Sequence, residues 1–165
     1  MKKAVLLALL TLALSACQAP NSSSSSGQSK IPLEYVENGG LVEISGAELY
    51  QKVITEQKNV PFLVTIPGCQ ACATAKADLD AFAVSLHFIV YFLTLDSSAA
   101  DYATTYDYLY RATNEASEYT DEAGWPEIGE DYSVPCLYVM YETWIGMCVF
   151  ESFTTNLVQY TEVVQ

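Results

Sequence analysis

The sequence is poor in histidine, in basic residues and in long apolar runs. It has one histidine, seven Lys or Arg residues and 20 Asp or Glu residues, which give a formal net charge of −13. This acidic balance argues against nucleic acid as a partner and against electrostatic docking on anionic lipid. The single histidine, His87, follows a predicted helix, so we interpret it as a boundary residue and not as a catalytic base.

Hydrophobic residues are plentiful, by contrast. They make up 51% of the 165 residues, and tyrosine is the most frequent aromatic residue. Such a composition excludes a disordered polyelectrolyte, and the length suits one domain with one core.

The amino terminus has the pattern of an export signal. Lys2 and Lys3 precede the apolar run Ala4–Leu14, which at 11 residues is too short to cross a bilayer. The next residues, Leu14-Ser15-Ala16-Cys17, resemble the lipobox of bacterial lipoproteins. The resemblance implies that residues 1–16 are a signal peptide and that Cys17 is lipidated. The alternative is an ordinary secretory signal that happens to contain a cysteine.

Residues 17–35 are predicted to be a flexible tether, because Asn21–Gly27 is a polar, serine-rich run with nothing to bury. The folded domain is then expected over residues 36–165. Loss of Lys2 and Lys3 with the signal would make the formal charge −15. Attachment to the extracytoplasmic face of a bacterial cell membrane would therefore depend on the acyl chains alone.

Apolar segments alternate with helical patterns through the first half of this domain. Ser45 and Glu48 have the spacing of a capping box, and Cys69–Leu86 has a helical apolar stripe. The strand-helix-strand-helix-strand order implies helices packed on a mainly parallel sheet. The predicted strands are Leu41–Ile44, Val60–Ile66 and Phe88–Leu95. The predicted inward residues of the two helices are Leu49, Tyr50, Val53, Ile54, Leu79, Phe82, Ala83 and Leu86.

The second half predicts a helix, a loop, a hairpin and a closing helix. The first helix spans Asp101–Tyr119, and the loop Thr120–Asp131 contains glycine and proline. Cys136–Tyr141 and Ile145–Phe150 predict the hairpin, and Thr154–Val164 the last helix. The expected inward residues are Tyr102, Tyr106, Leu109, Tyr110, Leu157, Tyr160 and Val164.

The chemistry centres on Cys69-Gln70-Ala71-Cys72, at a predicted strand-to-helix junction. The positive end of the helix dipole stabilises an anionic thiolate at Cys69, while Cys72 lies one turn deeper. The outer sulfur can attack a disulfide and the inner one can resolve the mixed disulfide. We therefore predict Cys69 and Cys72 as catalytic residues.

From about Leu41 onward the chain resembles the thioredoxin-like family. The features that carry the resemblance are the strand-helix-strand start, the Cys-x-x-Cys motif, the dipeptide Val134-Pro135 before a hairpin, and a final helix. The resemblance implies an α/β fold with a central mixed sheet flanked by helices. It also implies that Pro135 is cis and faces the cysteine pair, and that Val134 offers backbone hydrogen bonds to an extended substrate. The element order, taken with the lipobox, is most similar to extracytoplasmic thiol-disulfide oxidoreductases and bacteriocin transport accessory-like proteins.

The chain departs from that family's pattern at three places. Gly68 stands where an aromatic residue usually precedes the first cysteine. Leu63 stands where the family has a buried acid that assists proton transfer. Gln70-Ala71 matches neither strongly reducing nor strongly oxidising members, so the direction of electron flow stays open.

Two further cysteines, Cys136 and Cys148, belong to the predicted hairpin. They are a candidate second disulfide. Alternatively, Cys136 takes part in the redox site, or joins Cys69 and Cys72 around a soft metal; the absence of a nearby histidine disfavours the metal, and no metal or cofactor is expected.

Two functions fit this sequence. The first is an oxidoreductase that acts on protein thiols or disulfides of the cell envelope. The second is a non-catalytic lipoprotein that binds an export or envelope partner, with Cys69 and Cys72 as a structural bridge. In both cases we expect a monomer.

Overall fold

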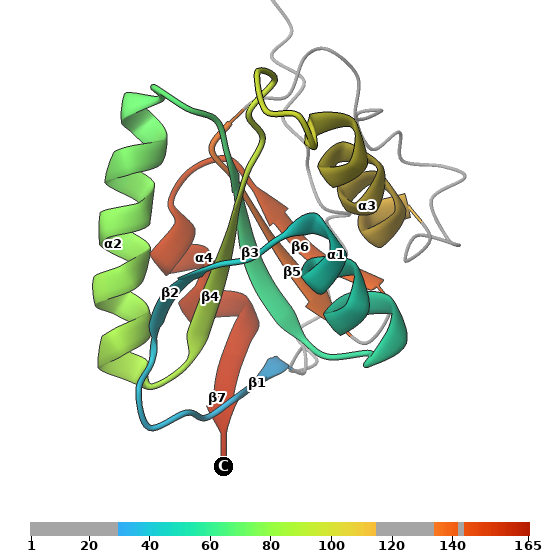
Figure 1. Ribbon diagram of the computed structural model, residues 1–165. Coiled ribbons are helices and arrows are strands. Elements are labelled where there is room, and N and C mark those ends of the chain that lie inside the picture. The colour runs from blue at the N-terminus through green and yellow to red at the C-terminus, as the bar shows by residue number, and fades with distance from the viewer. Residues whose placement is uncertain (1–29, 115–133, 142–143) are drawn as a thin grey trace, which may run out of the picture.

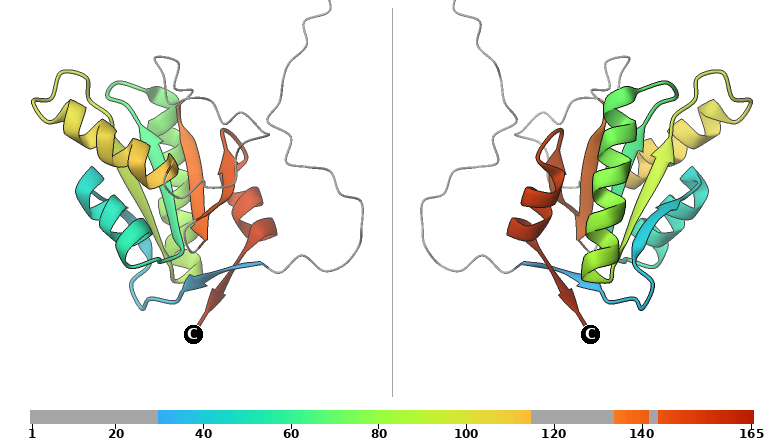
Figure 2. Two further views of the ribbon diagram at one scale, coloured as in Figure 1. Left: turned by 90° about the vertical axis from the view of Figure 1, so that its right-hand side faces the viewer. Right: turned by 90° about the vertical axis from the view of Figure 1, so that its left-hand side faces the viewer.

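A computed structural model describes residues 30–114, 134–141 and 144–165. A central sheet separates two helical layers (Figure 1). Viewed from the sides, α1 and α3 lie together on one face of the sheet, and α2 and α4 cover the other (Figure 2). The elements are β1 Ile31–Glu34, β2 Gly40–Glu43, α1 Gly46–Tyr50, the π-helical turn η1 Gln51–Thr55, β3 Val60–Thr65, α2 Gln70–Leu86, β4 Ile89–Thr94, α3 Tyr102–Asn114, β5 Cys136–Tyr141, β6 Trp144–Val149, α4 Phe153–Tyr160 and β7 Thr161–Val164.

The main sheet has the order β2-β4-β3-β5-β6. Strands β2 and β3 both pair with β4 in parallel, while β5 runs antiparallel to β3 and to β6. All six residues of the central strand β3 are buried, as its continuous apolar run predicts. The predicted mixed α/β architecture is therefore confirmed.

The layer of α1, η1 and α3 begins with the predicted capping box. The backbone N–H of Glu48 donates to Ser45 Oγ at 3.2 Å, and the N–H of Ser45 donates to Glu48 Oε2 at 3.0 Å. Gly46 lies so close to α3 that a Cβ atom would come within 2.9 Å of the Thr105 carbonyl oxygen. The first core cluster fills the space between this layer and the sheet: Ile44, Leu49, Val53, Val60, Phe62, Val64, Leu93, Leu95, Leu109, Ala112, Cys136, Tyr138 and Met140.

On the opposite face, α2 runs antiparallel to its neighbouring strands and ends at His87. His87 adopts a left-handed conformation, with φ of 59°, and its N–H donates to the last turn of the helix. The prediction of a boundary residue is confirmed, since a left-handed residue typically ends a helix. The second core cluster lies here: Ile31, Leu33, Leu63, Ala75, Leu79, Ala83, Phe88, Val90, Leu137, Val139 and Leu157.

The prediction that Leu86 and Tyr110 face inward is wrong, because the neighbouring elements leave both residues exposed. Leu86, in the last turn of α2, is 43% exposed, and Tyr110 of α3 is 46% exposed. Helical periodicity identifies a stripe, but the extent of the surface packed against it decides where burial stops.

The predicted closing helix is also wrong in its last turn. The helix α4 ends at Tyr160, and Thr161–Val164 form β7, which pairs in parallel with β1. Thr161 and the two valines are β-branched and favour a strand once a partner is present. Val164, predicted to face inward, is 42% exposed.

The partner strand β1 shows that the folded part begins earlier than the sequence predicts. Residues 31–34 lie within the predicted tether 17–35, yet Ile31 and Leu33 are buried in the second core cluster. The folded domain therefore begins before residue 36. The predicted signal peptide 1–16, Cys17, most of the tether and the loop 120–131 lie outside the described residues.

Two leucines of α2 test this packing. Replacing the fully buried Leu79 by alanine should lower the free energy of unfolding by about 2–5 kcal/mol, since it leaves a cavity in the second core cluster. The matched control, Leu86→Ala, should cost less than about 1 kcal/mol because 43% of Leu86 is exposed to solvent. Urea denaturation of the oxidised protein measures both; equal losses would contradict the assigned faces of α2.

Candidate active site

Cys69 and Cys72 form a disulfide at the start of α2, with their Cα atoms 5.2 Å apart. Cys69 is the N-cap of the helix, and its Sγ accepts the backbone N–H of Cys72 at 3.1 Å. Cys69 is partly exposed, whereas Cys72 is only 2% exposed. The pair thus has one accessible sulfur at a helix N-terminus and one buried sulfur behind it.

The chain reaches this helix through Pro67 and Gly68. Gly68 has φ of +72°, a left-handed conformation that glycine adopts without a Cβ penalty. This explains why the residue before Cys69 is glycine where the thioredoxin-like pattern has an aromatic side chain. A bulky residue at this position would have to adopt a disfavoured backbone conformation.

The peptide bond between Val134 and Pro135 is cis, as the family resemblance implies. Val64 of β3 pairs with Cys136 of β5 in the antiparallel register. Continuing that register by one residue brings Pro135 level with Thr65, at the end of β3 from which the chain turns toward Cys69. The dipeptide and the cysteine pair therefore lie at the same end of the sheet, the upper end in Figure 1.

No acid occupies the buried position on β3, since Leu63 is fully buried there and pairs with Phe92 of β4. The side chain of Lys76 lies over this part of the sheet, with Nζ 3.6 Å from the centre of the Phe92 ring. Burial lowers the pKa of Lys76, and the nearby carboxylate of Glu43 opposes that shift. No sequence motif points to Lys76 as part of the site, although its spacing of four residues from Cys72 puts both on one helix face.

Cys136 and Cys148 also lie side by side. Their Sγ atoms are 3.4 Å apart, and both residues are thiols in this structure. Their predicted disulfide is thus brought within contact distance but is not formed. Among the described residues, no group of three or more His, Cys, Asp or Glu side chains is arranged to hold a metal ion.

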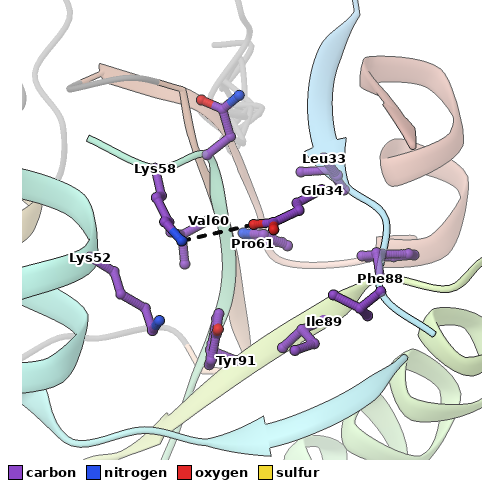
Figure 3. A pocket seen from close by; sticks show the side chains of 11 residues that line it. Leu33, Glu34, Lys52, Lys58, Val60, Pro61, Phe88, Ile89 and Tyr91 are labelled. Atoms are coloured by element: carbon purple, nitrogen blue, oxygen red, sulfur yellow. Dashed lines mark ion pairs between the residues drawn. The ribbon is translucent and has the colours of Figure 1, made fainter. Parts of the chain in front are cut away.

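A separate small cavity of about 60 Å³ lies at the other end of the sheet (Figure 3). It is lined by Val60 and Pro61, at the beginning of β3, and by Lys58 and Glu34, whose Nζ and Oε2 atoms form an ion pair 3.9 Å long. Strand β3 separates it from the cysteine pair by roughly 20 Å, the length of six extended residues. The cavity is therefore not part of the cysteine site.

Comparisons with known proteins bear on the fold. No protein-family model matches this sequence, and a search of curated proteins finds no significant match. Among solved structures, the chain is similar to thioredoxin O1 from Arabidopsis thaliana in the oxidised state, with a TM-score of 0.51 and 11% identity over 74% of this chain and 99% of the other. Thioredoxin O2 from the same plant is 12% identical, with a TM-score of 0.46, over 72% of this chain and 89% of its own.

Three observations indicate the same fold. They are the order and direction of the strands, the helices on both faces of the sheet, and the similarity to thioredoxin O1. The protein has a thioredoxin-like fold, with Cys69 and Cys72 at the start of its longest described helix.

Proposed function

We propose that this protein is an extracytoplasmic thiol-disulfide oxidoreductase that acts on the disulfides of exported proteins through Cys69 and Cys72. The observation that carries the proposal is the asymmetric pair at the start of α2, with a partly exposed Cys69 and a buried Cys72. A purely structural bridge has no need of an accessible sulfur at a helix N-terminus, whereas disulfide exchange does.

The reaction follows from the two environments. In the reduced protein the Cys69 thiolate attacks one sulfur of a substrate disulfide, and the other substrate sulfur leaves as a thiolate that takes up a proton. Cys72 then loses its proton and attacks Cys69 Sγ, which releases the second substrate sulfur. Two electrons have moved from the protein to the substrate, and the protein holds the observed disulfide. Run in reverse, the same steps oxidise a substrate dithiol.

Several groups around the pair fit these steps. The N–H of Cys72 already donates to Cys69 Sγ and would stabilise the attacking thiolate. The backbone next to Pro135, at the same end of the sheet, is suited to bind an extended substrate segment through Val134. Lys76, one helical turn after Cys72 on the same face of α2, is the nearest basic side chain along this face, and its Nζ lies 3.6 Å from the centre of the Phe92 ring.

The proposed location depends on the amino-terminal pattern. The basic residues, the short apolar run and the lipobox-like Leu14-Ser15-Ala16-Cys17 support export and lipid attachment at Cys17. Within residues 30–114, 134–141 and 144–165, no helix has both the length and the apolar character needed to cross a membrane. We propose a monomeric domain that an acyl chain on Cys17 and a serine-rich tether attach to the membrane.

A second candidate function is that of a non-catalytic lipoprotein that binds an envelope partner. Leu63 in place of the family's buried acid favours it, because the usual proton acceptor is missing. In that case the Cys69–Cys72 bridge only stabilises the start of α2.

Serine variants of the two cysteines test the reaction. Cys69→Ser should reduce insulin-disulfide reduction to the uncatalysed rate, because the attacking sulfur is lost. Cys72→Ser should also stop turnover but trap a mixed disulfide with the substrate, visible on a non-reducing gel. The control Ala73→Ser, which adds a hydroxyl on the exposed side of the same turn, should keep wild-type activity. Unchanged activity in both cysteine variants would refute the proposed reaction.

The reduction potential of the pair separates the two functions. We expect a value above about −300 mV, in the range of exchanging pairs, from equilibration of Cys69 and Cys72 with dithiol buffers. A value below that level would support the structural bridge and the binding function.

Lipid attachment has its own test. When the full chain is expressed in a bacterial host, the wild type should fractionate with membranes and incorporate labelled palmitate. Cys17→Ser should do neither, because the acceptor sulfur is absent. A wild-type protein found entirely in the soluble fraction, without label, would contradict the proposed anchor.

A further inference from the structure

Cys136 and Cys148 occupy one face of the hairpin formed by β5 and β6. Tyr138 of β5 pairs with Cys148 of β6, so Cys136, two residues before Tyr138, is the diagonal neighbour of Cys148. Both cysteines contribute to the first core cluster, under α1 and α3. Their Sγ atoms, 3.4 Å apart, are already in van der Waals contact.

The two thiols have unequal environments. Cys136 is fully buried, whereas Cys148 is partly exposed on β6, which is an outer strand of the described sheet. Hydrogen bonds from Cys136 and, to a smaller extent, from Tyr138 lower the pKa of Cys148, although burial acts in the opposite direction. Cys148 is thus the more accessible sulfur, with a pKa lowered by its neighbours, and Cys136 is the sheltered one.

We propose that Cys136 and Cys148 are a second redox pair, which an external low-molecular-weight or protein disulfide reversibly oxidises to a disulfide. The supporting geometry is the contact between the two sulfurs and the difference in their exposure. Cys136 and Cys148 belong to the first core cluster, on the face of α1 and α3, whereas Cys69 and Cys72 are bonded to each other at the start of α2.

The oxidation needs no cofactor, because the external disulfide accepts the two electrons. The thiolate of Cys148 attacks one sulfur of the external disulfide, and the other sulfur leaves as a thiolate and is protonated. Cys136 then loses its proton and attacks Cys148 Sγ, releasing the second external sulfur as a thiol. Two protein thiols become one disulfide, and one external disulfide becomes two thiols.

The bond requires only a short approach of the two sulfurs. The sulfurs must approach from 3.4 Å to a bonding distance of about 2.05 Å. Strand β6 lies at an edge of the described sheet, and the β5–β6 register shifts between Val139 and Met140. An edge strand next to such an irregularity can move without breaking pairing on a second side.

The test is a redox titration of the full chain in glutathione buffers, with acid quenching, alkylation and peptide mass spectrometry. Cys136 and Cys148 should lose alkylation together along one two-electron curve, and a peptide pair linked through both residues should appear. In Cys69→Ser/Cys72→Ser the same curve should persist, so this result does not depend on the proposed activity. The proposal is overturned if both thiols remain alkylated in excess oxidised glutathione, if only separate glutathione adducts form, or if oxidation disappears in the double variant.

The rate of iodoacetamide labelling of Cys148 against pH provides a second measurement. The titratable groups acting on Cys148 in the described part of the chain are Cys136 and Tyr138. Cys136→Ala should shift the midpoint to higher pH, because it removes the hydrogen bond that contributes most to lowering the pKa of Cys148. Cys136→Ser retains a hydrogen-bond donor and should restore most of the shift. An unchanged midpoint in Cys136→Ala would contradict the contact on which the pair depends.

Discussion

Strand β3 lies between β4 and β5, and its complete burial governs the rest of the structure. A buried strand must pair its backbone N–H and C=O groups on both sides, because no water reaches them. Parallel pairing with β4 and antiparallel pairing with β5 satisfy this requirement. Since β5 runs in the opposite direction, it starts where β3 ends. Cys69 and Pro135, far apart in the sequence, thereby lie at the same end of the sheet.

The two cysteine pairs have one feature in common. Each combines a partly exposed sulfur with a buried one, at Cys69 and Cys72 and at Cys148 and Cys136. In the first pair, Cys69 Sγ accepts the backbone N–H of Cys72 at the start of the helix. In the second pair, hydrogen bonds from the Cys136 thiol and the Tyr138 phenol lower the pKa of Cys148. The first pair lies at the start of α2, whereas the second belongs to the core cluster on the face of α1 and α3.

The features of the fold and the site that the sequence predicts are those that depend on residues close together in the chain. The capping box at Ser45 and Glu48, the helix start at Cys69 and the strand β3 follow from neighbouring residues, and the structure confirms each. The end of α4 was missed, because residues 161–164 form a strand only through pairing with β1. Leu86 and Tyr110 were placed inward by periodicity, but the surrounding elements do not extend over them. Lys76 was overlooked because its contact with Phe92 joins α2 to β4.

The sequence alone determined where the first cysteine pair lies and how its sulfurs differ. Two cysteines three residues apart at a strand-to-helix turn have little conformational choice, since one helical turn brings them together. The tertiary structure alone decided the contact between Cys136 and Cys148, which depends on the diagonal register of β5 and β6 and on its shift at Val139. It also decided that residues 31–34 belong to the folded domain, because β1 pairs with β7. The contact between Cys136 and Cys148 and the place of residues 31–34 depend on pairing between separate strands, which no local sequence pattern specifies.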